Sequence, residues 1–432
     1  MNFPQALRYL DALIGMGIKV GLDHTRTLAR ALGDPQRSFP CVIVGGTNGK
    51  GSTAAYLATI LQGAGYRTGL FTSPHLVDVR ERIRVNGRMI GKEAFAEAAS
   101  RLRTTAEEAV RNGLLEGCPT YFEALTLMGF LHFMRERVEA GVLEVGLGGR
   151  LDCTNIADPS VSVVTNVSRD HEEWLGKGVM RIAREKAGIF RPGVPALTAA
   201  NGTRVLSVLR GEAERLGTRL LPMSDCRVNV GTNGWRMECG DDSLDLPLPA
   251  LPGGHQVDNA ALAVRCCWVL RRMGWPISDE SIRQGIAGAR WPGRLELAAR
   301  WPETYLDGAH NPDGCRALAR WVAERPEGRR ALVFTAMKDK PIGVMAQLLF
   351  PYFGRVWATA VPMTRCAQPE IIRRRSRGLV TDLAEEPREA LAAARRWAGS
   401  GGLVVAAGSL YLVGYLKSFL EEADPLSWGS GL

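Results

Sequence analysis

The heptapeptide GTNGKGS at residues 46–52 combines the residue types that bind nucleotide phosphates. It follows the apolar run CVIVG and precedes a stretch with helical spacing, Ala54–Gln62. Glycines let backbone amides approach a polyphosphate, and a helix N-terminus adds the positive end of its dipole. Lys50 could neutralise the β- and γ-phosphates, and the Ser52 hydroxyl could reach a magnesium ion. Because Gly51 separates these two residues, the segment departs from the strict GxxxxGK[ST] pattern. The strand, glycines, lysine, hydroxyl and helix together predict a phosphate-binding loop.

The tetrapeptide GTNG recurs at residues 231–234, where its neighbours predict a different role. Polar and apolar residues alternate on both sides, in CRVNV before it and WRMEC after it. No basic or hydroxylated residue follows that could hold a phosphate. Asn233-Gly234 is a pair typical of a tight hairpin, in which both residues have positive φ. This copy is predicted to be a turn.

Three more polar residues, Ser73, Glu144 and His171, stand at or soon after predicted strands, and Lys186 follows in the segment REKAGIF. The carboxyl edge of an open α/β sheet is where such folds bind ligands, so Ser73 could be a hydroxyl ligand there. A charged residue that ends a buried strand, such as Glu144, needs a partner, and a metal ion is a common one. Each residue alone also has a structural interpretation: a turn, a hydrogen-bonded histidine or a solvated helix lysine.

The elements that would position these residues alternate along the chain. Apolar runs begin at Cys41, Gly141, Ser162, Ala331 and Leu403, and helical spacing is found at Ala54–Gln62, Glu93–Glu108 and Arg316–Glu324. Alternating strands and helices predict doubly wound, parallel α/β sheets. Residues 218–250 instead predict short antiparallel strands added to the first domain. The segment Trp291–Arg294 lies between a helix and a new strand, so we expect domains at 1–295 and 296–432.

Composition indicates an ordinary globular protein: 432 residues, 46% hydrophobic and 7% aromatic, enough for two or three domains. The N-terminus lacks the basic start and apolar run of a signal peptide, and the apolar stretch from Gly402 is too short and too broken for a membrane span. The nine cysteines include no CxxC pair, which disfavours zinc sites and disulfides. We therefore expect a cytoplasmic protein without a membrane partner.

The net charge is +9 with a pI near 9.2, and the densest basic cluster is Arg373–Arg377. No interleaved aromatic residues or recognisable nucleic-acid module accompany the cluster, so we expect no nucleic-acid partner. A solvated helix face is the favoured interpretation. Besides a nucleic-acid patch and a solvated helix face, a third interpretation is that the positive field of the protein attracts anionic small molecules such as ATP.

In their order along the chain, the motifs resemble the Mur ligase superfamily and, more closely, the folylpolyglutamate synthase/dihydrofolate synthase family. The matching segments are GTNGKGS, SPHL with ERIRVNG, TYFEALT, LEVGLGGRLDCTN, DHEEWLG, REKAGIFRPG, WPGR, DGAHNP, MKDK and GSLYLVG. The resemblance implies an α/β fold, with a P-loop-type, mostly parallel sheet domain and a smaller, Rossmann-like C-terminal domain. It implies an ATP-dependent ligase that adds L-glutamate to dihydropteroate and to the γ-carboxylate of reduced folates through an acyl phosphate. We expect a monomer.

The resemblance also implies roles for individual residues. The ATP site would comprise Thr47, Asn48, Gly49, Lys50, Gly51, Ser52, Asn259, Arg294 and Asp307. Two magnesium ions would be held by Ser52 with Ser73 and by Glu144 with His171, and potassium is a further candidate cation. Lys186 would be carboxylated on its amine, and the catalytic residues would be Lys50, Lys186 and His171. Folate would contact Thr120, Tyr121, Phe122, Glu123, Leu151, Asp152 and Cys153, with Ile18–Val20 nearby, and glutamate would contact His310 and Ser409.

Two features of this pattern bear on the chemistry. A bare ammonium at Lys186 would repel a nearby Mg²⁺, whereas a carbamate has the opposite charge. Family members often have Ala or Ser where this chain has Cys153, which puts the folate contact there in question. The alternatives are an enzyme with folylpolyglutamate synthase activity alone, a P-loop kinase or regulatory NTPase, and a nonenzymatic nucleic-acid binder. A kinase would release ADP without needing both a carboxylic acid and an amino acid.

Overall fold

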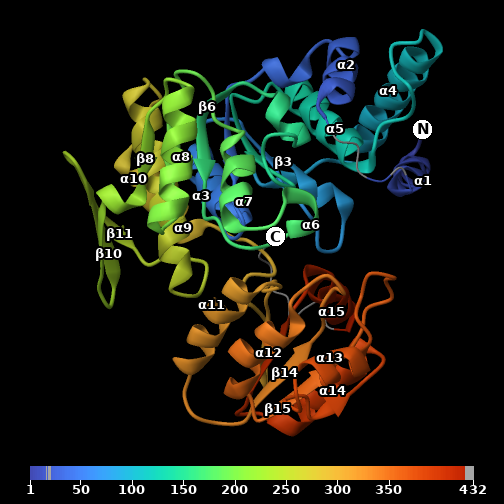
Figure 1. The fold of residues 1–432 in the computed structure, drawn as a ribbon, viewed down its shortest axis with the longest axis vertical. Coiled ribbons are helices and arrows are strands. Elements are labelled where there is room, and N and C mark those ends of the chain that lie inside the picture. Colours follow the sequence, from blue (N-terminus) through green and yellow to red (C-terminus); the bar gives the residue numbers. More distant parts are fainter. Residues whose placement is uncertain (16, 18–20, 424–432) are drawn as a thin grey trace. The chain divides into compact units, whose positions relative to one another are not determined.

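The computed structural model describes residues 1–15, 17 and 21–423, which form two compact units (Figure 1). The first unit consists of Met1–Pro74, Arg80–Ala250 and Val257–Ala289, and the second of His75–Val79, Leu251–Gln256 and Arg290–Leu432. The expected folate contact at Ile18–Val20 lies outside the described residues. No helix in the described part of the chain is long and apolar enough to cross a bilayer.

An eight-stranded sheet forms the centre of the first unit, in the order β4-β3-β2-β5-β1-β6-β7-β8. Its strands are β1 (Cys41–Gly45), β2 (Thr68–Phe71), β3 (Ile83–Val85), β4 (Arg88–Met89), β5 (Ala140–Glu144), β6 (Pro159–Val164), β7 (Ala196–Thr198) and β8 (Leu220–Pro222). The strands β2, β5, β1, β6, β7 and β8 pair in parallel in that order. The strands β3 and β4 add an antiparallel edge beside β2. The central strands β1 and β5 are buried along their whole length, as continuous apolar runs in a covered parallel sheet should be.

The first unit also contains helices that pack on the sheet or on one another. They are α1 (Phe3–Ile14), α2 (Asp23–Ala31), α3 (Lys50–Gly63), α4 (Lys92–Arg111), α5 (Tyr121–Arg135), α6 (Glu172–Leu175), α7 (Val179–Ala187), α8 (Thr203–Arg215), α9 (His255–Arg272) and α10 (Asp279–Gly288), with short 3-10 turns η1 (Pro35–Arg37), η2 (Val79–Arg82), η3 (Cys153–Ile156) and η4 (Met223–Asp225). α3 packs on β1, β2 and β5 and is covered in turn by α10, so it is apolar nearly all round.

Residues 218–250 were predicted to be antiparallel throughout, and this was wrong for the first strand. β8 extends the main sheet by pairing in parallel with β7. The antiparallel part is a separate three-stranded sheet of β9 (Arg227–Val230), β10 (Gly234–Cys239) and β11 (Asp242–Pro247). A strand of three residues carries too little alternation to show its direction of pairing.

The second GTNG is a turn between β9 and β10, as predicted, but the predicted φ values were wrong. Neither Asn233 nor Gly234 has positive φ. Gly234 is already the first residue of β10, and a Cβ there would lie 2.6 Å from the carbonyl oxygen of Leu246 on β11. Close approach of the neighbouring strand, rather than a left-handed turn, explains this glycine.

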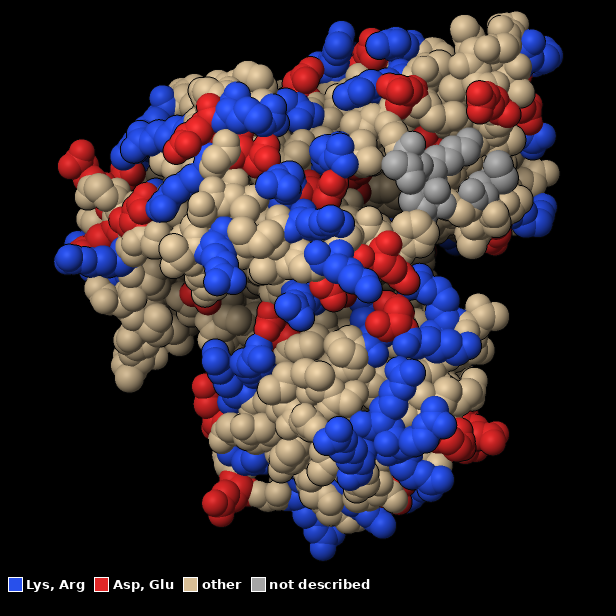
Figure 2. Space-filling view, viewed as in Figure 1, with Lys and Arg blue, Asp and Glu red and all other residues tan. Residues whose placement is uncertain are grey.

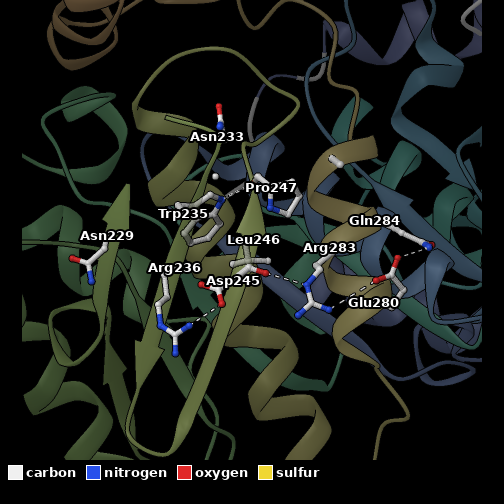
Figure 3. Close-up of a pocket in the computed structure, with 12 residues that line it drawn as sticks. Asn229, Asn233, Trp235, Arg236, Asp245, Leu246, Pro247, Glu280, Arg283 and Gln284 are labelled. Atoms are coloured by element: carbon white, nitrogen blue, oxygen red, sulfur yellow. Dashed lines mark hydrogen bonds and ion pairs between the residues drawn. The ribbon is translucent and has the colours of Figure 1, made fainter. Parts of the chain in front are cut away.

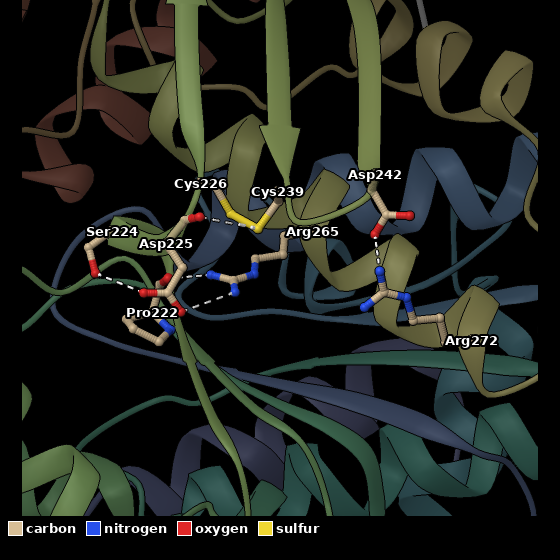
Figure 4. Close-up of a disulfide and its surroundings, with 8 residues drawn as sticks. All are labelled: Pro222, Ser224, Asp225, Cys226, Cys239, Asp242, Arg265 and Arg272. Atoms are coloured by element: carbon tan, nitrogen blue, oxygen red, sulfur yellow. Dashed lines mark hydrogen bonds and ion pairs between the residues drawn. A yellow bond between two sulfur atoms is a disulfide. The ribbon is translucent and has the colours of Figure 1, made fainter.

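The expectation that the cysteines form no disulfide was also wrong, because Cys226 and Cys239 are bonded (Figure 4). The two residues are opposite one another, one step beyond the Arg227–Glu238 pair of β9 and β10. Next to them, Arg265 of α9 donates to the carbonyl oxygen of Pro222 and lies 3.7 Å from Asp225 Oδ2. The spacing of the two cysteines about the turn would have revealed the pair once the hairpin register was known.

The second unit is a doubly wound sheet in the order β12-β13-β17-β14-β15-β16, parallel except for β12. Its strands are β12 (Glu296–Arg300), β13 (Glu303–Leu306), β14 (Arg330–Phe334), β15 (Arg355–Ala358), β16 (Asp382–Leu383) and β17 (Leu403–Ala407). Its helices are α11 (Pro312–Ala323), α12 (Ile342–Leu349), α13 (Pro369–Arg375), α14 (Pro387–Ala398) and α15 (Leu410–Ala423), and a 3-10 turn, η5 (Phe350–Tyr352), follows α12. Alternate β14 residues enter two cores, Leu332 and Phe334 on one face and Ala331 and Val333 on the other. The predicted α/β class is confirmed for both units.

The basic cluster of this unit lies on α13, where Arg373, Arg374 and Arg375 occupy the last turn and are exposed. Cations in the last turn of a helix interact favourably with its dipole. Figure 2 shows Lys and Arg side chains across the visible face, with Asp and Glu among them. The cluster therefore matches the predicted solvated helix face.

Candidate functional site

The first GTNG forms a loop between β1 and α3 whose glycines are required by close contacts. Gly46 has φ of 137°, and a Cβ there would lie 1.9 Å from Thr165 Oγ1. Gly49 has φ of 82°, and its Cβ would lie 2.2 Å from Asn259 Oδ1 on α9. Both conformations strongly favour glycine.

The N-terminus of α3 has no side-chain cap. Gly49 occupies the cap position and supplies no hydrogen bond to the first turn from a side chain. The first backbone N–H groups of a helix lack partners within the helix, and with its dipole they form an anion site. Lys50 begins this turn, and its Nζ donates to the carbonyl oxygen of Thr47 at 3.2 Å. Ser52, in the same turn, is buried.

The segment after β6 holds the loop in place. The backbone N–H of Thr47 donates to the carbonyl oxygen of Asn166 at 2.9 Å, and that of Asn48 donates to Asn166 Oδ1 at 2.8 Å. Thr165 Oγ1 donates to the carbonyl oxygen of Asn48 at 2.6 Å. Sequence reasoning missed these two residues, although polar side chains directly after the buried strand SVV were the signal.

Lys186 lies under the same loop, and its Nζ donates to the carbonyl oxygen of Gly46 at 2.7 Å. The side chain is buried. Burial, reinforced by the nearby charge of Lys50, lowers the pKa of Lys186 to about 7, while Asp170 and Asp152 act in the opposite direction. Near neutral pH a large share of this amine is therefore uncharged and nucleophilic.

Ser73 and Glu144 meet at the carboxyl edge of the main sheet, because β2 and β5 are neighbours. The backbone N–H of Ser73 donates to Glu144 Oε2 at 3.1 Å, and Glu144 is 5% exposed. His171, before α6, has φ of 52°, which is uncommon for a residue with a side chain. Its Nε2 lies 3.9 Å from Asp170 Oδ1.

No cluster of three or more His, Cys, Asp or Glu that could hold a metal ion occurs in residues 1–15, 17 and 21–423. Mg²⁺ does not need such a cluster, because it commonly keeps several waters and binds through one or two carboxylates together with substrate phosphates. The pair Ser52 and Ser73 and the pair Glu144 and His171 would each leave most positions of such an ion to water and nucleotide.

The predicted folate segment 120–123 forms the start of α5. Thr120 is its N-cap and accepts from the backbone N–H of Glu123, while Glu123 Oε2 accepts from that of Thr120 at 2.8 Å. The Phe122 ring fills the space beside Gly146, where a Cβ would lie 2.5 Å from Phe122 Cζ. The Arg82 guanidinium lies over the Tyr121 ring at 5.6 Å.

The second predicted folate segment, 151–153, leads into η3. The buried Asp152 accepts from the backbone N–H groups of Gly146 and Leu147 at 2.9 Å each and from the Thr154 hydroxyl at 2.6 Å. Burial raises its pKa despite these bonds. Leu151 is exposed, and Cys153 Sγ lies 3.7 Å from Thr25 Oγ1. Thr25 also donates to Glu123 Oε1 at 2.9 Å, so α2 joins the two segments.

In the second unit, the predicted residues gather where β13 and β17 end. Asp307 is buried and accepts from the backbone N–H groups of Leu295 and Ala309 at 2.9 Å each. His310 Nδ1 donates to the carbonyl oxygen of Gly308 at 2.7 Å. The backbone N–H of Gly408, next to Ser409, donates to the carbonyl oxygen of Ala309 at 2.8 Å. Arg294 Nη1 donates to the carbonyl oxygen of Gly293 at 3.1 Å.

A cavity of about 760 Å³ lies between the three-stranded sheet and α10 (Figure 3). None of the predicted site residues lines it. Its charged side chains are engaged with one another, as Arg236 is with Asp245 at 2.8 Å and Arg283 with Glu280 at 3.9 Å. The cavity carries no arrangement suited to the predicted chemistry.

Comparisons with known proteins identify the family of this chain. Residues 44–267 match the Mur ligase middle domain, and residues 293–410 match the Mur ligase, glutamate ligase domain. A Bacillus subtilis dihydrofolate synthase/folylpolyglutamate synthase is 33% identical, over 97% of this chain and 99% of that protein. The structure of Escherichia coli FolC in complex with DHPP and ADP has a TM-score of 0.89 at 32% identity, covering 98% of both chains. A bifunctional folylpolyglutamate synthase/dihydrofolate synthase with Mn, AMPPNP and L-glutamate bound has a TM-score of 0.86 at 32% identity, again covering 98% of both.

Proposed function

Because this chain belongs to the Mur ligase family, and within it to the folylpolyglutamate synthase/dihydrofolate synthases, we propose that it is an ATP-dependent ligase of L-glutamate. Its acceptors are dihydropteroate, which gives dihydrofolate, and the γ-carboxylate of reduced folates. A relative of similar length carries both activities in its name.

The observation that carries this proposal is the uncapped start of α3 behind a glycine loop, with Lys50 in its first turn. The amides of Thr47 and Asn48 are occupied by Asn166, so the phosphates of ATP fit best at Gly49, Lys50, Gly51 and Ser52. We assign Asn259, beside Gly49, to the same ATP site. Arg294 and Asp307 of the second unit complete the proposed ATP-binding set.

We assign two Mg²⁺ sites, the first to Ser52 and Ser73 and the second to Glu144 and His171. The relative solved with Mn and AMPPNP supports a divalent cation with the nucleotide. When bound, the metal neutralises charge on the phosphates. Potassium is a further candidate cation.

We propose that Lys186 carries a carbamate. The neutral amine attacks CO₂, forms an N–C bond and releases one proton, which leaves a carboxylate on Nζ. The low pKa of this buried amine supports the step, because only the uncharged form is nucleophilic. The product is an anion, which would attract the proposed metal ions where an ammonium would repel them.

The chemistry follows from the weakness of a carboxylate as an electrophile. The acceptor carboxylate attacks the γ-phosphorus of ATP, ADP leaves, and an acyl phosphate forms. The glutamate amine then attacks the acyl carbon, phosphate leaves, and an amide results. Lys50 neutralises charge on the transferred group, while His310 and Ser409 hold glutamate for the second step.

We propose that 120–123 and 151–153 form the pterin-side pocket and that the domains are 1–295 for ATP and folate and 296–432 for glutamate. We propose further that the enzyme is a monomer in the cytoplasm and binds no nucleic acid. The Cys226–Cys239 disulfide counts against the cytoplasm, because a reducing compartment does not favour disulfides.

An ADP-release assay tests the function. The enzyme is incubated with ATP and Mg²⁺, and with L-glutamate, dihydropteroate or tetrahydrofolate added singly or as acid–glutamate pairs. We expect sustained ADP release only when both an acid and glutamate are present. Equal release without either would favour a kinase or a regulatory NTPase.

A further inference from the structure

The carboxylate of Glu123 is the centre of a buried hydrogen-bond network. Oε1 accepts from Thr25 Oγ1 and faces His24 Nδ1, both at 2.9 Å, and Oε2 accepts from the backbone N–H of Thr120 at 2.8 Å. The side chain is 4% exposed. Burial alone would raise the pKa of Glu123, but the hydrogen bonds from His24, Thr120 and Thr25 outweigh it and lower the pKa. Glu123 is therefore an anion whose oxygens are directed into the protein.

His24 carries the matching charge. Its Nε2 lies 2.9 Å from the carbonyl oxygen of Gly117, which can only accept, so Nε2 bears a proton. Its Nδ1 faces the ionised Glu123, which also accepts, so Nδ1 bears a proton as well. Two acceptors facing the two ring nitrogens suit an imidazolium, and the side chain is only 15% exposed. Charge-assisted hydrogen bonds of this kind are stronger than neutral ones.

The network joins three elements that are far apart in the sequence. His24 and Thr25 belong to α2, Glu123 to the first turn of α5, and Cys153 to η3, and these elements pack on one another. Gly117 lies in the connection that leads into α5. The two segments assigned to the folate pocket therefore meet through α2, which itself carries none of the residues assigned to the site.

We propose that His24 is a positioning residue for folate binding, which holds Glu123 and so fixes the start of α5 against η3. The inference rests on the proposed function and deepens it. Glu123 then acts through the fold rather than by touching substrate, and Tyr121 and Phe122 remain the members of its turn that contact folate. A loss of the His24 bond would let the two segments move apart without disturbing the phosphate loop.

The test is a set of steady-state measurements on the full-length enzyme, varying tetrahydrofolate, ATP and L-glutamate in turn. His24→Leu removes both donors and should raise the KM for tetrahydrofolate about tenfold or more, as expected for losing a hydrogen bond to a charged group. The KM values for ATP and glutamate should stay unchanged. His24→Gln, which keeps an N–H donor, should recover part of the loss. Asp23→Asn, at a fully exposed site on the same helix, is the matched control and should behave as wild type.

If His24→Leu fails to fold, His24→Gln carries the test, and its KM for tetrahydrofolate should still exceed that of the wild type. A normal KM for tetrahydrofolate in a folded His24 variant would overturn the inference. So would an equal rise in all three KM values accompanied by a lower melting temperature, because that pattern marks a general structural role. Wild-type enzyme that releases no ADP with any acceptor would sink the proposed function and this inference with it. An active wild type with an unaffected variant sinks the inference alone.

Discussion

Two lysines border the proposed phosphate-binding loop, and their surroundings suit different roles. Lys50 is half-buried in the first turn of α3, where its amine can follow an incoming phosphate. Lys186 is buried against the carbonyl oxygen of Gly46, where a charge is costly and the amine loses its proton readily. The first therefore suits electrostatic stabilisation, and the second suits covalent modification.

Lys50→Ala should lower kcat by about a hundredfold or more, the magnitude typical of losing one group that stabilises transition-state charge. The melting temperature should hardly change, because the side chain supports no core. Ligation assays and a thermal melt measure both quantities. Lys92→Ala, at an exposed lysine that begins α4, is the control. Near-normal ligation by Lys50→Ala would refute the phosphate-loop assignment.

Carbamate on Lys186 should depend on pH in a defined direction. The pKa of the amine is lowered to about 7, so the group is protonated and unreactive below pH 7 and nucleophilic above it. In ¹³CO₂-equilibrated buffer, the carbamate ¹³C signal should be strong at pH 8 and fade as the pH falls below about 7. Lys186→Ala should lack the signal, and small carboxylates should restore part of its activity. A signal absent at every pH would rule the modification out.

At the scale of elements, the loop depends on glycines that meet specific neighbours. Gly46→Ala places a Cβ 1.9 Å from Thr165 Oγ1, so the loop must shift, and we expect a large rise in the KM for ATP. Gly65→Ala is the control, because Gly65 also has a positive φ, of 93°, but no atom within 4 Å of the added Cβ. Equal KM values for ATP in the two variants would contradict the expected effect of the contact with Thr165.

The disulfide is a covalent cross-link between β9 and β10, and it closes their hairpin across a separation of 13 residues. Replacing both cysteines by serine should lower stability by about 2–3 kcal/mol, the loop-closure value for this length. Ligation should be unchanged, because no assigned site residue lies in the hairpin. Mass spectrometry after alkylation of denatured, unreduced protein should find seven modified cysteines. Nine would mean that the bond does not form in solution.

Sequence patterns predicted the long helices and strands and the loop before α3, but they did not predict the contacts between distant segments. Buried runs such as CVIVG predict strands because both faces of a parallel sheet are covered, and β1 confirms this. The role of Asn166 in holding the loop, and the meeting of His24 with Glu123, depend on the order of strands and the packing of helices. Spacing along one chain carries no information on such pairs.

For the whole molecule, the proposed residues fall in both units, and each unit contributes a different part of the chemistry. The first carries Lys50, Lys186 and the folate segments, and the second carries Asp307, His310 and Ser409. The assignment of glutamate to the second unit accords with its match to the glutamate ligase domain. The proposal assigns one set of ATP residues and one set of glutamate residues, so these same residues must serve every acceptor that the enzyme accepts.

That requirement leads to the prediction that the enzyme uses both dihydropteroate and tetrahydrofolate. Dihydropteroate presents its own carboxylate, so the pterin must lie deep enough to direct that group at the γ-phosphate. A folate that already carries glutamate is longer by about one residue length and must bind displaced outward. Steady-state assays with each acceptor measure both activities. We propose that Cys153 borders the deeper of the two pterin positions; its Sγ lies 3.7 Å from Thr25 Oγ1, beside the His24–Glu123 network. Glutamate addition to tetrahydrofolate alone would reduce the enzyme to elongation, and recovery of the dihydropteroate reaction in Cys153→Ala would then locate the obstruction at that thiol.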